Sequence, residues 1–221
     1  MPNLKDYNLT TTHQPSLAPE KKLWRKGFKR VACLDEAGRG PLAGPVVAAA
    51  VLITDCEFRI GDLLRKIKDS KKLTPQKRKN FFGIITKHPA IEWGVGRVSE
   101  KVIDKINILE ATKLAMKKAV KKLKKRPQLL IIDGNFKINL PIPQKPIIKA
   151  DEKVFSCASA SVLAKVWRDR IMQRYHKKYP RYGFDKHKGY PTKLHLKMLK
   201  RYGPCKIHRK SFRPVANYFK K

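Results

Sequence analysis

Acidic residues are scarce in this sequence: 17 Asp and Glu stand against 52 Lys and Arg in 221 residues, a formal net charge of +35. So uneven a balance indicates a polyanionic partner, and nucleic acid is the obvious one. A Lys-rich composition can also reflect the solvated faces of helices, and a ribosomal-type binding protein would carry a similar charge. The charge therefore predicts the class of partner and leaves open what happens to it.

Long hydrophobic runs are missing. The longest, 46–53, has eight residues, whereas a membrane-spanning helix needs roughly 18. The sequence therefore predicts no membrane protein. Residues 1–14 are polar, and the first apolar stretch begins only after Arg30. Because this differs from the apolar core of a secretory leader, we expect a cytoplasmic protein.

Cysteine is also rare, with four residues far apart and no C-x-x-C pair. Cys205 and His208 have the spacing of metal ligands, but no second pair completes a zinc site. We interpret the cysteines as buried or incidental thiols in a reducing compartment. The hydrophobic fraction of 42% is near the globular norm, so the chain is long enough to bury a real core.

Apolar segments alternate with helical patterns along the chain. Residues 1–27 are polar, contain three prolines, and are expected to form an extended or partly ordered arm. One α/β domain is expected over 28–221, with a small helical C-terminal portion from about 192. The strand patterns lie at 30–34, 46–53, 91–98, 128–132 and 146–149, and the helical patterns at 74–87, 107–125, 154–178 and 192–202.

The few carboxylates gather where predicted strands end. Asp35 and Glu36 follow the first strand, Asp133 follows the fourth, and Asp151 follows the fifth. Ligands bind beyond the carboxyl ends of strands in open sheets, so these four side chains are expected to converge. Four carboxylates repel one another unless a cation neutralises them, and all-oxygen ligation suits Mg²⁺ or Mn²⁺.

Any one of these acids could be an ordinary cap or turn residue. Three separate strand ends in so basic a chain instead favour a two-metal site for phosphodiester hydrolysis, with Lys and Arg holding the phosphates. Only 11 residues, 35–45, separate the first two strands, which favours an antiparallel connection.

The loop that leaves the first strand is rich in glycine. A nucleotide-cofactor loop is excluded, because the third glycine is misplaced for G-x-G-x-x-G and Pro41 and Pro45 lead into a strand rather than a helix. Glycines let a backbone approach a ligand closely. Main-chain groups at Gly38 and Gly40 could therefore contact a sugar 2′-hydroxyl, the group that distinguishes RNA from DNA.

The run Asp-Glu-Ala-Gly-Arg-Gly-Pro-Leu-Ala-Gly-Pro at 35–45 closely resembles the opening motif of the ribonuclease HII family. The resemblance covers about 30–215 and continues, in the family's order, through 69–74, 107–112, 132–134, 159–166, 187–190 and 208–212. It implies a ribonuclease H-like α/β fold, with a central mixed five-stranded sheet flanked by helices. It also implies that the catalytic, metal-binding acids are Asp35, Glu36, Asp133 and Asp151.

The same resemblance implies a substrate and a reaction. The substrates would be RNA/DNA hybrids and DNA duplexes that contain ribonucleotides, cut on the 5′ side of the ribonucleotide to leave 3′-hydroxyl and 5′-phosphate ends, with Mg²⁺ or Mn²⁺ bound. We expect a monomer. Gly38, Arg39 and Gly40 would contact the 2′-hydroxyl, and Tyr190 would pack on the sugar. The expected phosphate contacts are Lys71, Lys72, Lys165, His187 and Lys188.

Other interpretations remain open beside this one. A tyrosine in a loop is more often a packing residue. Asp169, inside a long predicted helix, is expected to be an ion-pair partner rather than a fifth metal ligand. The alternative function is that of a non-catalytic RNA- or DNA-binding protein whose acids are structural. Such a protein would retain a duplex in EDTA and would never cut it when metal is restored.

Overall fold

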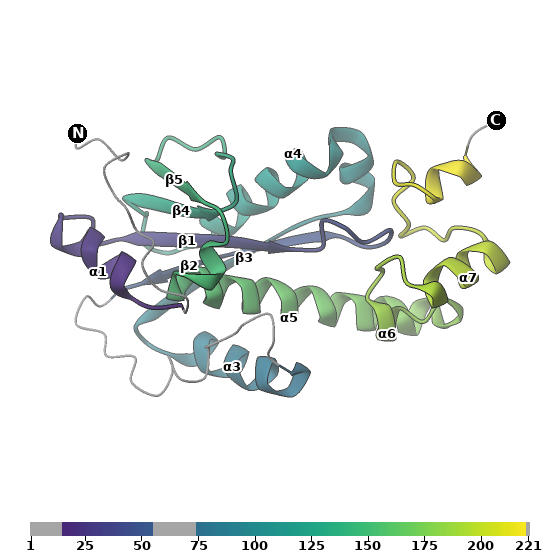
Figure 1. The fold of residues 1–221 in the computed structure, drawn as a ribbon, viewed down its shortest axis with the longest axis horizontal. Coiled ribbons are helices and arrows are strands. Elements are labelled where there is room, and N and C mark those ends of the chain that lie inside the picture. The colour runs from purple at the N-terminus through teal and green to yellow at the C-terminus, as the bar shows by residue number, and fades with distance from the viewer. Residues whose placement is uncertain (1–14, 55–73, 220–221) are drawn as a thin grey trace.

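The computed structural model describes residues 15–54 and 74–219. Its centre is a five-stranded sheet in the order β3-β2-β1-β4-β5 (Figure 1). The first three strands pair antiparallel, whereas β1, β4 and β5 run parallel. The predicted mixed five-stranded sheet and its antiparallel first connection are therefore confirmed. The strands are β1 (Val31–Ala37), β2 (Val46–Ile53), β3 (Ile91–Val98), β4 (Leu129–Asp133) and β5 (Gln144–Ile147).

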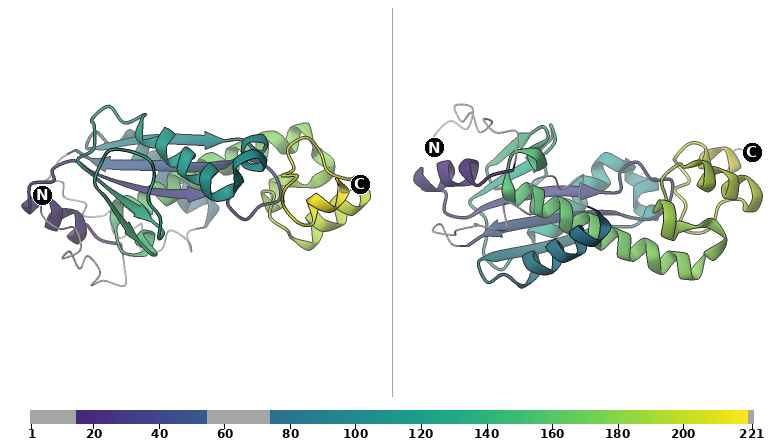
Figure 2. Two further views of the ribbon diagram at one scale, coloured as in Figure 1. Left: turned by 90° about the horizontal axis from the view of Figure 1, so that it is seen from above. Right: turned by 60° about the horizontal axis from the view of Figure 1, so that its bottom comes forward.

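Two long helices cover the two faces of this sheet. Helix α4 (Glu100–Val120) lies across one face, and α5 (Phe155–Lys178) runs along the other with α3 (Pro75–Lys87) beside it (Figures 1 and 2). The remaining helices are α1 (Ala18–Arg25), α6 (Phe184–His187) and α7 (Lys193–Tyr202), and the short 3-10 turns are η2 (Ala150–Glu152), η3 (Pro180–Tyr182) and η4 (Val215–Tyr218). Within the described ranges, no helix is long and apolar enough to cross a bilayer.

Side chains of β1 alternate between two cores, because successive residues of a strand point to opposite faces. Val31 and Cys33 belong to the core against α5, and Ala32 and Leu34 to the core against α4. The same alternation continues into the acidic end of the strand.

Strand β1 is longer than the sequence indicated. Asp35 and Glu36 lie inside it rather than after it, because the pairing with β2 continues through Asp35↔Ala49 and Glu36↔Ala48. The polar residues end the hydrophobic pattern but not the hydrogen-bonded ladder. The fifth strand likewise lies earlier than expected, and Lys149 adopts a left-handed conformation with φ of 57°.

Two threonines marked helix starts correctly, those of α3 and α7. Thr74 and Thr192 each accept a hydrogen bond from the backbone three residues later, at 3.3 Å. Helix α4 starts earlier than predicted, at Glu100, and is interrupted at Asn107, where φ is 64°. The Asn107 side chain accepts from the backbone of Leu109 and caps the second half of the helix. The expected start at 107 is thus an internal break.

The described part of the N-terminal arm is integrated into the fold. Residues 18–25 form α1 where an extended or partly ordered arm was expected, and Leu23 and Trp24 are buried in the core. Ser16 also pairs with Val154 in an isolated bridge. Residues 1–14 of the expected arm lie outside the described residues.

The C-terminal elements gather at one end of the molecule, beyond the tip of the β1–β2 loop (Figures 1 and 2). They share a small core that includes Tyr182, Phe184 and Ile207 and that also takes in Ala43 of the loop. The backbone of Ala43 forms an isolated bridge with His208. This portion of the chain therefore packs against the glycine-rich loop, which is the β1–β2 connection at 38–45.

Candidate active site

Three aspartates meet at one edge of the sheet. Asp35, Asp133 and Asp151 each offer a carboxylate oxygen, and these three atoms all lie within 4.8 Å of one another. Asp35 and Asp133 come from the neighbouring parallel strands β1 and β4, and Asp151 comes from the turn η2 that follows β5. The Asp133 carboxylate accepts a hydrogen bond from the Ala150 amide at 2.9 Å, which ties this turn to β4.

Glu36 lies beside this group and not within it. Strand alternation directs Asp35 to the same face as Cys33, towards α5, and Glu36 to the opposite face. One Glu36 oxygen accepts from Arg39 Nη1 at 3.3 Å. The other oxygen is buried and, within the described residues, has no hydrogen-bond partner. The fourth predicted acid therefore lies outside the group of three oxygens within 4.8 Å of one another, although the charges of Asp133 and Asp151 act on it.

The electrostatics of the group favour a bound cation. Burial raises the pKa of Asp35 well above its usual value, and the charges of Glu36 and Asp133 raise it further. Burial also raises the pKa of Glu36 to about 7, although Arg39 opposes this shift. Buried carboxylates that repel one another lose this penalty when a divalent cation binds between them. The all-oxygen donor set fits Mg²⁺ or Mn²⁺.

The glycine-rich loop lies next to Tyr190. Gly38 is buried with φ of 99°, whereas Arg39 and Gly40 are exposed. A Cβ atom added at Gly40 would meet only Tyr190 Cε1, at 3.8 Å. The Leu42 amide donates to the Gly189 carbonyl at 2.8 Å, which joins the two loops. The structure thus brings together the residues expected to contact the sugar, and the Tyr190 side chain is 40% exposed.

The expected phosphate contacts differ in their surroundings. Lys165 forms an ion pair with Asp169 at 2.6 Å on the same helix, as the i,i+4 spacing of Asp169 suggested. The Lys188 ammonium contacts the Asp185 carbonyl oxygen. Both lysines are partly exposed. Lys71 and Lys72 lie outside the described residues.

His187 has a different position from the one expected of a phosphate contact. Its side chain is buried, with Nε2 2.7 Å from the Tyr182 carbonyl oxygen and Nδ1 accepting from the Gly189 amide at 3.1 Å. Its ring also stacks on His195, with centroids 4.3 Å apart. Because both nitrogens are engaged with the backbone, His187 supports the loop that presents Tyr190.

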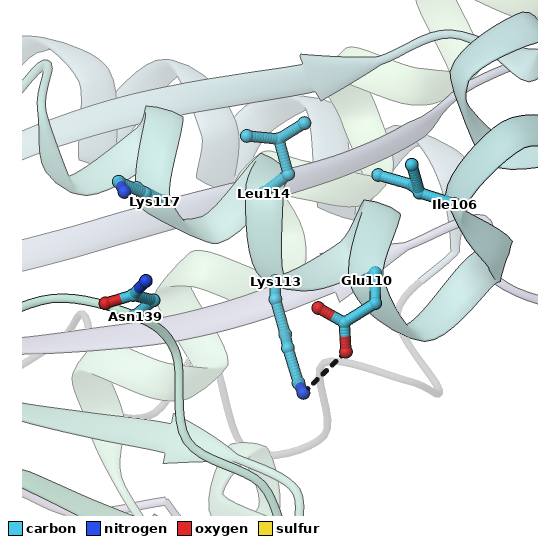
Figure 3. A pocket seen from close by; sticks show the side chains of 6 residues that line it. All are labelled: Ile106, Glu110, Lys113, Leu114, Lys117 and Asn139. Carbon is cyan, nitrogen blue, oxygen red and sulfur yellow. Dashed lines mark hydrogen bonds and ion pairs between the residues drawn. The ribbon is translucent and has the colours of Figure 1, made fainter.

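A hollow between α4 and the segment that joins β4 to β5 lacks such a group of carboxylates (Figure 3). Its volume is about 370 Å³, and Ile106, Leu114 and Asn139 contribute to its lining. Its acid, Glu110, is paired with Lys113 at 2.7 Å. The aspartate group, rather than this hollow, is therefore the candidate active site.

The model of the family described as Ribonuclease HII matches residues 32–215. The chain belongs to the ribonuclease HII family. The ribonuclease HII of Chlamydia trachomatis serovar A is 48% identical over 93% of this chain and 94% of its own length. That of Chlorobaculum parvum is 52% identical over 88% and 94%. The predictions of family and of a ribonuclease H-type hydrolase are confirmed.

A solved ribonuclease H2 from Pyrococcus horikoshii has the same fold. It matches with a TM-score of 0.69 at 30% identity, over 85% of this chain and 96% of its own. The ribonuclease H-like fold predicted from the ribonuclease HII motifs is therefore confirmed.

Sequence reasoning missed two buried arginines of this ribonuclease HII chain. Arg168 on α5 and Arg209 after α7 are both 0% exposed, and both donate to carbonyl groups of the glycine-rich loop. Among 52 basic residues, charge alone gave no signal for them. Arg209 does lie inside the motif at 208–212, which was the one available clue.

Proposed function

We propose that this protein is a metal-dependent endoribonuclease. It would cut the RNA strand of RNA/DNA hybrids and the 5′ side of ribonucleotides embedded in duplex DNA, leaving 3′-hydroxyl and 5′-phosphate ends. The observation that carries the proposal is the group formed by Asp35, Asp133 and Asp151, whose oxygens lie within 4.8 Å of one another. This group belongs to a chain with a net charge of +35, which suits a polyanionic substrate.

The acids would divide the work of holding cations. Asp35, Asp133 and Asp151 would ligate Mg²⁺ or Mn²⁺, and Glu36, whose unpartnered oxygen is buried and feels the charges of Asp133 and Asp151, would complete the metal-binding set. Two such ions, when bound, supply an activated water and stabilise the departing 3′-oxygen. Because burial raises the pKa values of Asp35 and Glu36, these carboxyls would release protons as cations bind.

The glycine-rich loop beside the acids would distinguish ribose from deoxyribose. Arg39 and Gly40 are exposed, and their backbone amides could approach a 2′-hydroxyl closely because Gly40 carries no Cβ. Tyr190 would pack on the same sugar. Lys165, Lys188 and the two lysines at 71 and 72 would hold neighbouring phosphates, and His187 would keep the Tyr190 loop in place.

The decisive experiment uses a DNA duplex that contains one ribonucleotide. Wild-type protein with Mg²⁺ or Mn²⁺ should nick it on the 5′ side of the ribonucleotide, EDTA should abolish the nick, and restored metal should return it. Matched duplexes with 2′-deoxy or 2′-O-methyl at that position should stay intact. Retention of the duplex without any nick under all conditions would instead favour the non-catalytic binding protein. Equal cutting of ribo and deoxy duplexes would indicate a general nuclease.

We further propose that the enzyme acts as a monomer in the cytoplasm, on ribonucleotides that remain in DNA, as a step of ribonucleotide excision repair. Light scattering after gel filtration should give a mass near 25.5 kDa. A doubled mass at micromolar concentration would contradict the monomer.

A further inference from the structure

The buried guanidinium group of Arg209 donates hydrogen bonds to three carbonyl groups of the glycine-rich loop. Arg209 Nη2 donates to the Gly38 carbonyl at 2.6 Å, Nη1 to the Arg39 carbonyl at 2.8 Å, and Nε to the Gly44 carbonyl at 3.0 Å. The backbone around it is also paired, because the Arg209 amide donates to the Leu42 carbonyl at 2.8 Å. The C-terminal portion of the chain therefore grips both ends of the loop.

A second guanidinium holds the other side of the same loop. Arg168 donates to the carbonyls of Pro45, Ala43 and Lys188, at 3.0, 3.2 and 3.0 Å. Both arginines are fully buried. Burial and, next, the neighbouring Arg168 charge lower the pKa of Arg209 to about 9, so the group remains a cation at neutral pH. Two buried cations thus hold backbone carbonyls rather than carboxylates.

The hydrogen bonds of Arg209 fix the direction of two peptide planes. In a trans peptide, the N–H of the next residue points away from the carbonyl of the preceding one. When the Gly38 and Arg39 carbonyls point inward to buried Arg209, the amides of Arg39 and Gly40 point to the opposite, outer side. Within the described residues neither amide donates to another protein acceptor, and both residues are exposed.

We propose that Arg209 is a positioning residue for sugar selection: it turns the amides of Arg39 and Gly40 outward, where they meet the 2′-hydroxyl of the substrate. This inference rests on the proposed function. A planar guanidinium with donors in a rigid fork can hold three carbonyls at once, whereas a lysine ammonium is a compact charge on a flexible stem. An arginine is therefore required at position 209, because a lysine with the same charge could not hold all three carbonyls in this geometry.

A merely structural role would lower stability without changing which sugar is preferred. The test therefore measures the sugar preference itself. This preference is the affinity for a DNA duplex that contains one ribonucleotide, divided by the affinity for the matched all-deoxy duplex. Measurements in an Asp133→Asn background prevent cutting during the titration. The kcat and KM for the ribonucleotide duplex are measured separately with Asp133 intact.

Arg209→Lys should bring the affinity ratio close to one and lower kcat at least tenfold, while affinity for the all-deoxy duplex changes less than twofold. Tyr182→Phe is the matched control, because it removes a C-terminal hydrogen bond to the Gly203 carbonyl that does not touch the loop. It should leave the ratio and kcat unchanged. If folded Arg209→Lys keeps the wild-type ratio and kcat, Arg209 is not a positioning residue.

A second variant covers the case in which Arg209→Lys does not fold. Asp104 accepts from the amides of Lys210 and Ser211 at 3.0 and 2.9 Å and so anchors the segment beside Arg209 to α4. Asp104→Ala should lower the ratio in part, and an unchanged ratio would overturn the proposal. Wild-type protein that cuts no ribonucleotide duplex would overturn the proposed function itself. A different result, in which wild type and the Arg209 variant both prefer the ribonucleotide duplex to the same degree, would overturn only the role of Arg209.

Discussion

Glu20 of α1 accepts two hydrogen bonds from Ser156 at the start of α5, from its amide at 3.0 Å and from its hydroxyl at 2.8 Å. The N-cap residue of α5, Val154, offers no side-chain hydrogen bond. Glu20 therefore caps this helix from 136 positions away in the sequence. Because α5 follows the turn that carries Asp151, the N-terminal helix supports the active site from behind.

This contact makes stability depend on pH. Burial raises the pKa of Glu20 from 4.5 to about 7. The folded state thus holds the proton more tightly than the unfolded state, and the stabilisation present at acidic pH is lost as pH rises from about 4.5 through 7. Glu20→Gln should remove this part of the pH dependence. We expect the difference between variant and wild type to change by about 3 kcal/mol across that window.

Urea unfolding of both proteins at several pH values between 5 and 8, in EDTA, measures this effect. The other raised carboxyls, Asp35 and Glu36, titrate in both proteins and cancel in the comparison. Parallel stability curves for wild type and Glu20→Gln would show that Glu20 does not titrate in this range.

Replacing one aspartate of the group should separate cutting from binding. Asp133→Asn keeps an oxygen that can accept from the Ala150 amide, so the turn should stay in place. Cleavage should fall by more than about a hundredfold, because even changes around metal ligands cost about 10- to 100-fold. Duplex affinity should change little, as measured by fluorescence anisotropy. Wild-type cleavage by Asp133→Asn at saturating Mg²⁺ would refute the metal assignment.

The two loop glycines should respond differently to alanine. A Cβ at Gly38 would lie 2.1 Å from Arg168 Nε and 2.8 Å from the Pro45 carbonyl oxygen, at a φ of 99°. Gly38→Ala should therefore lower stability by about 2 kcal/mol or more. At Gly40 the nearest atom would be 3.8 Å away, so Gly40→Ala should fold normally.

Gly40→Ala should nevertheless lose at least about tenfold in kcat/KM, equivalent to about 1.4 kcal/mol, because its methyl group would lie where the sugar approaches. Thermal melts and titration with Mn²⁺ should match wild type. Full activity of Gly40→Ala would mean that the substrate does not pass close to this residue.

Salt should weaken substrate binding steeply. With a net charge of +35, binding through several phosphates should lose about a thousandfold in affinity or more between 50 and 200 mM salt. The measurement is a plot of log affinity against log salt for a duplex of fixed length. A nearly flat line would show that the surface lysines are not the binding determinant.

The sequence predicted the sheet well, since its strands are short apolar runs, and it predicted the starts of α3 and α7, since threonine caps precede both helices. It could not predict α1, whose eight residues include Lys21, Lys22 and Arg25 and whose stability comes from burying Leu23 and Trp24. Nor did it predict the first turns of α4, 100–106, because the apolar periodicity begins only after the break at Asn107.

The candidate site was predictable in part, because its acids follow the apolar pattern of the strands. Strand ends located the three aspartates, because the carboxyl ends of parallel strands share an edge. The position of Glu36 inside a strand was harder to predict, because the hydrophobic pattern of the first strand ends at Leu34 whereas β1 continues to Ala37. The inward position of His187 depends on the Tyr182 carbonyl, which lies in a turn that no local pattern indicates.

Helix α5 also connects the turn that carries Asp151 to a residue that holds the glycine-rich loop. Its first residue, Phe155, follows the Asp151 turn, and Arg168, 13 residues later, holds the glycine-rich loop. At 1.5 Å per residue these points lie about 20 Å apart along one rigid rod. One residue inserted between them would rotate Arg168 by about 100° around the helix axis and release the loop. The number of residues between Phe155 and Arg168 is therefore constrained, because an insertion or deletion there would remove the hydrogen bonds of Arg168 to the loop.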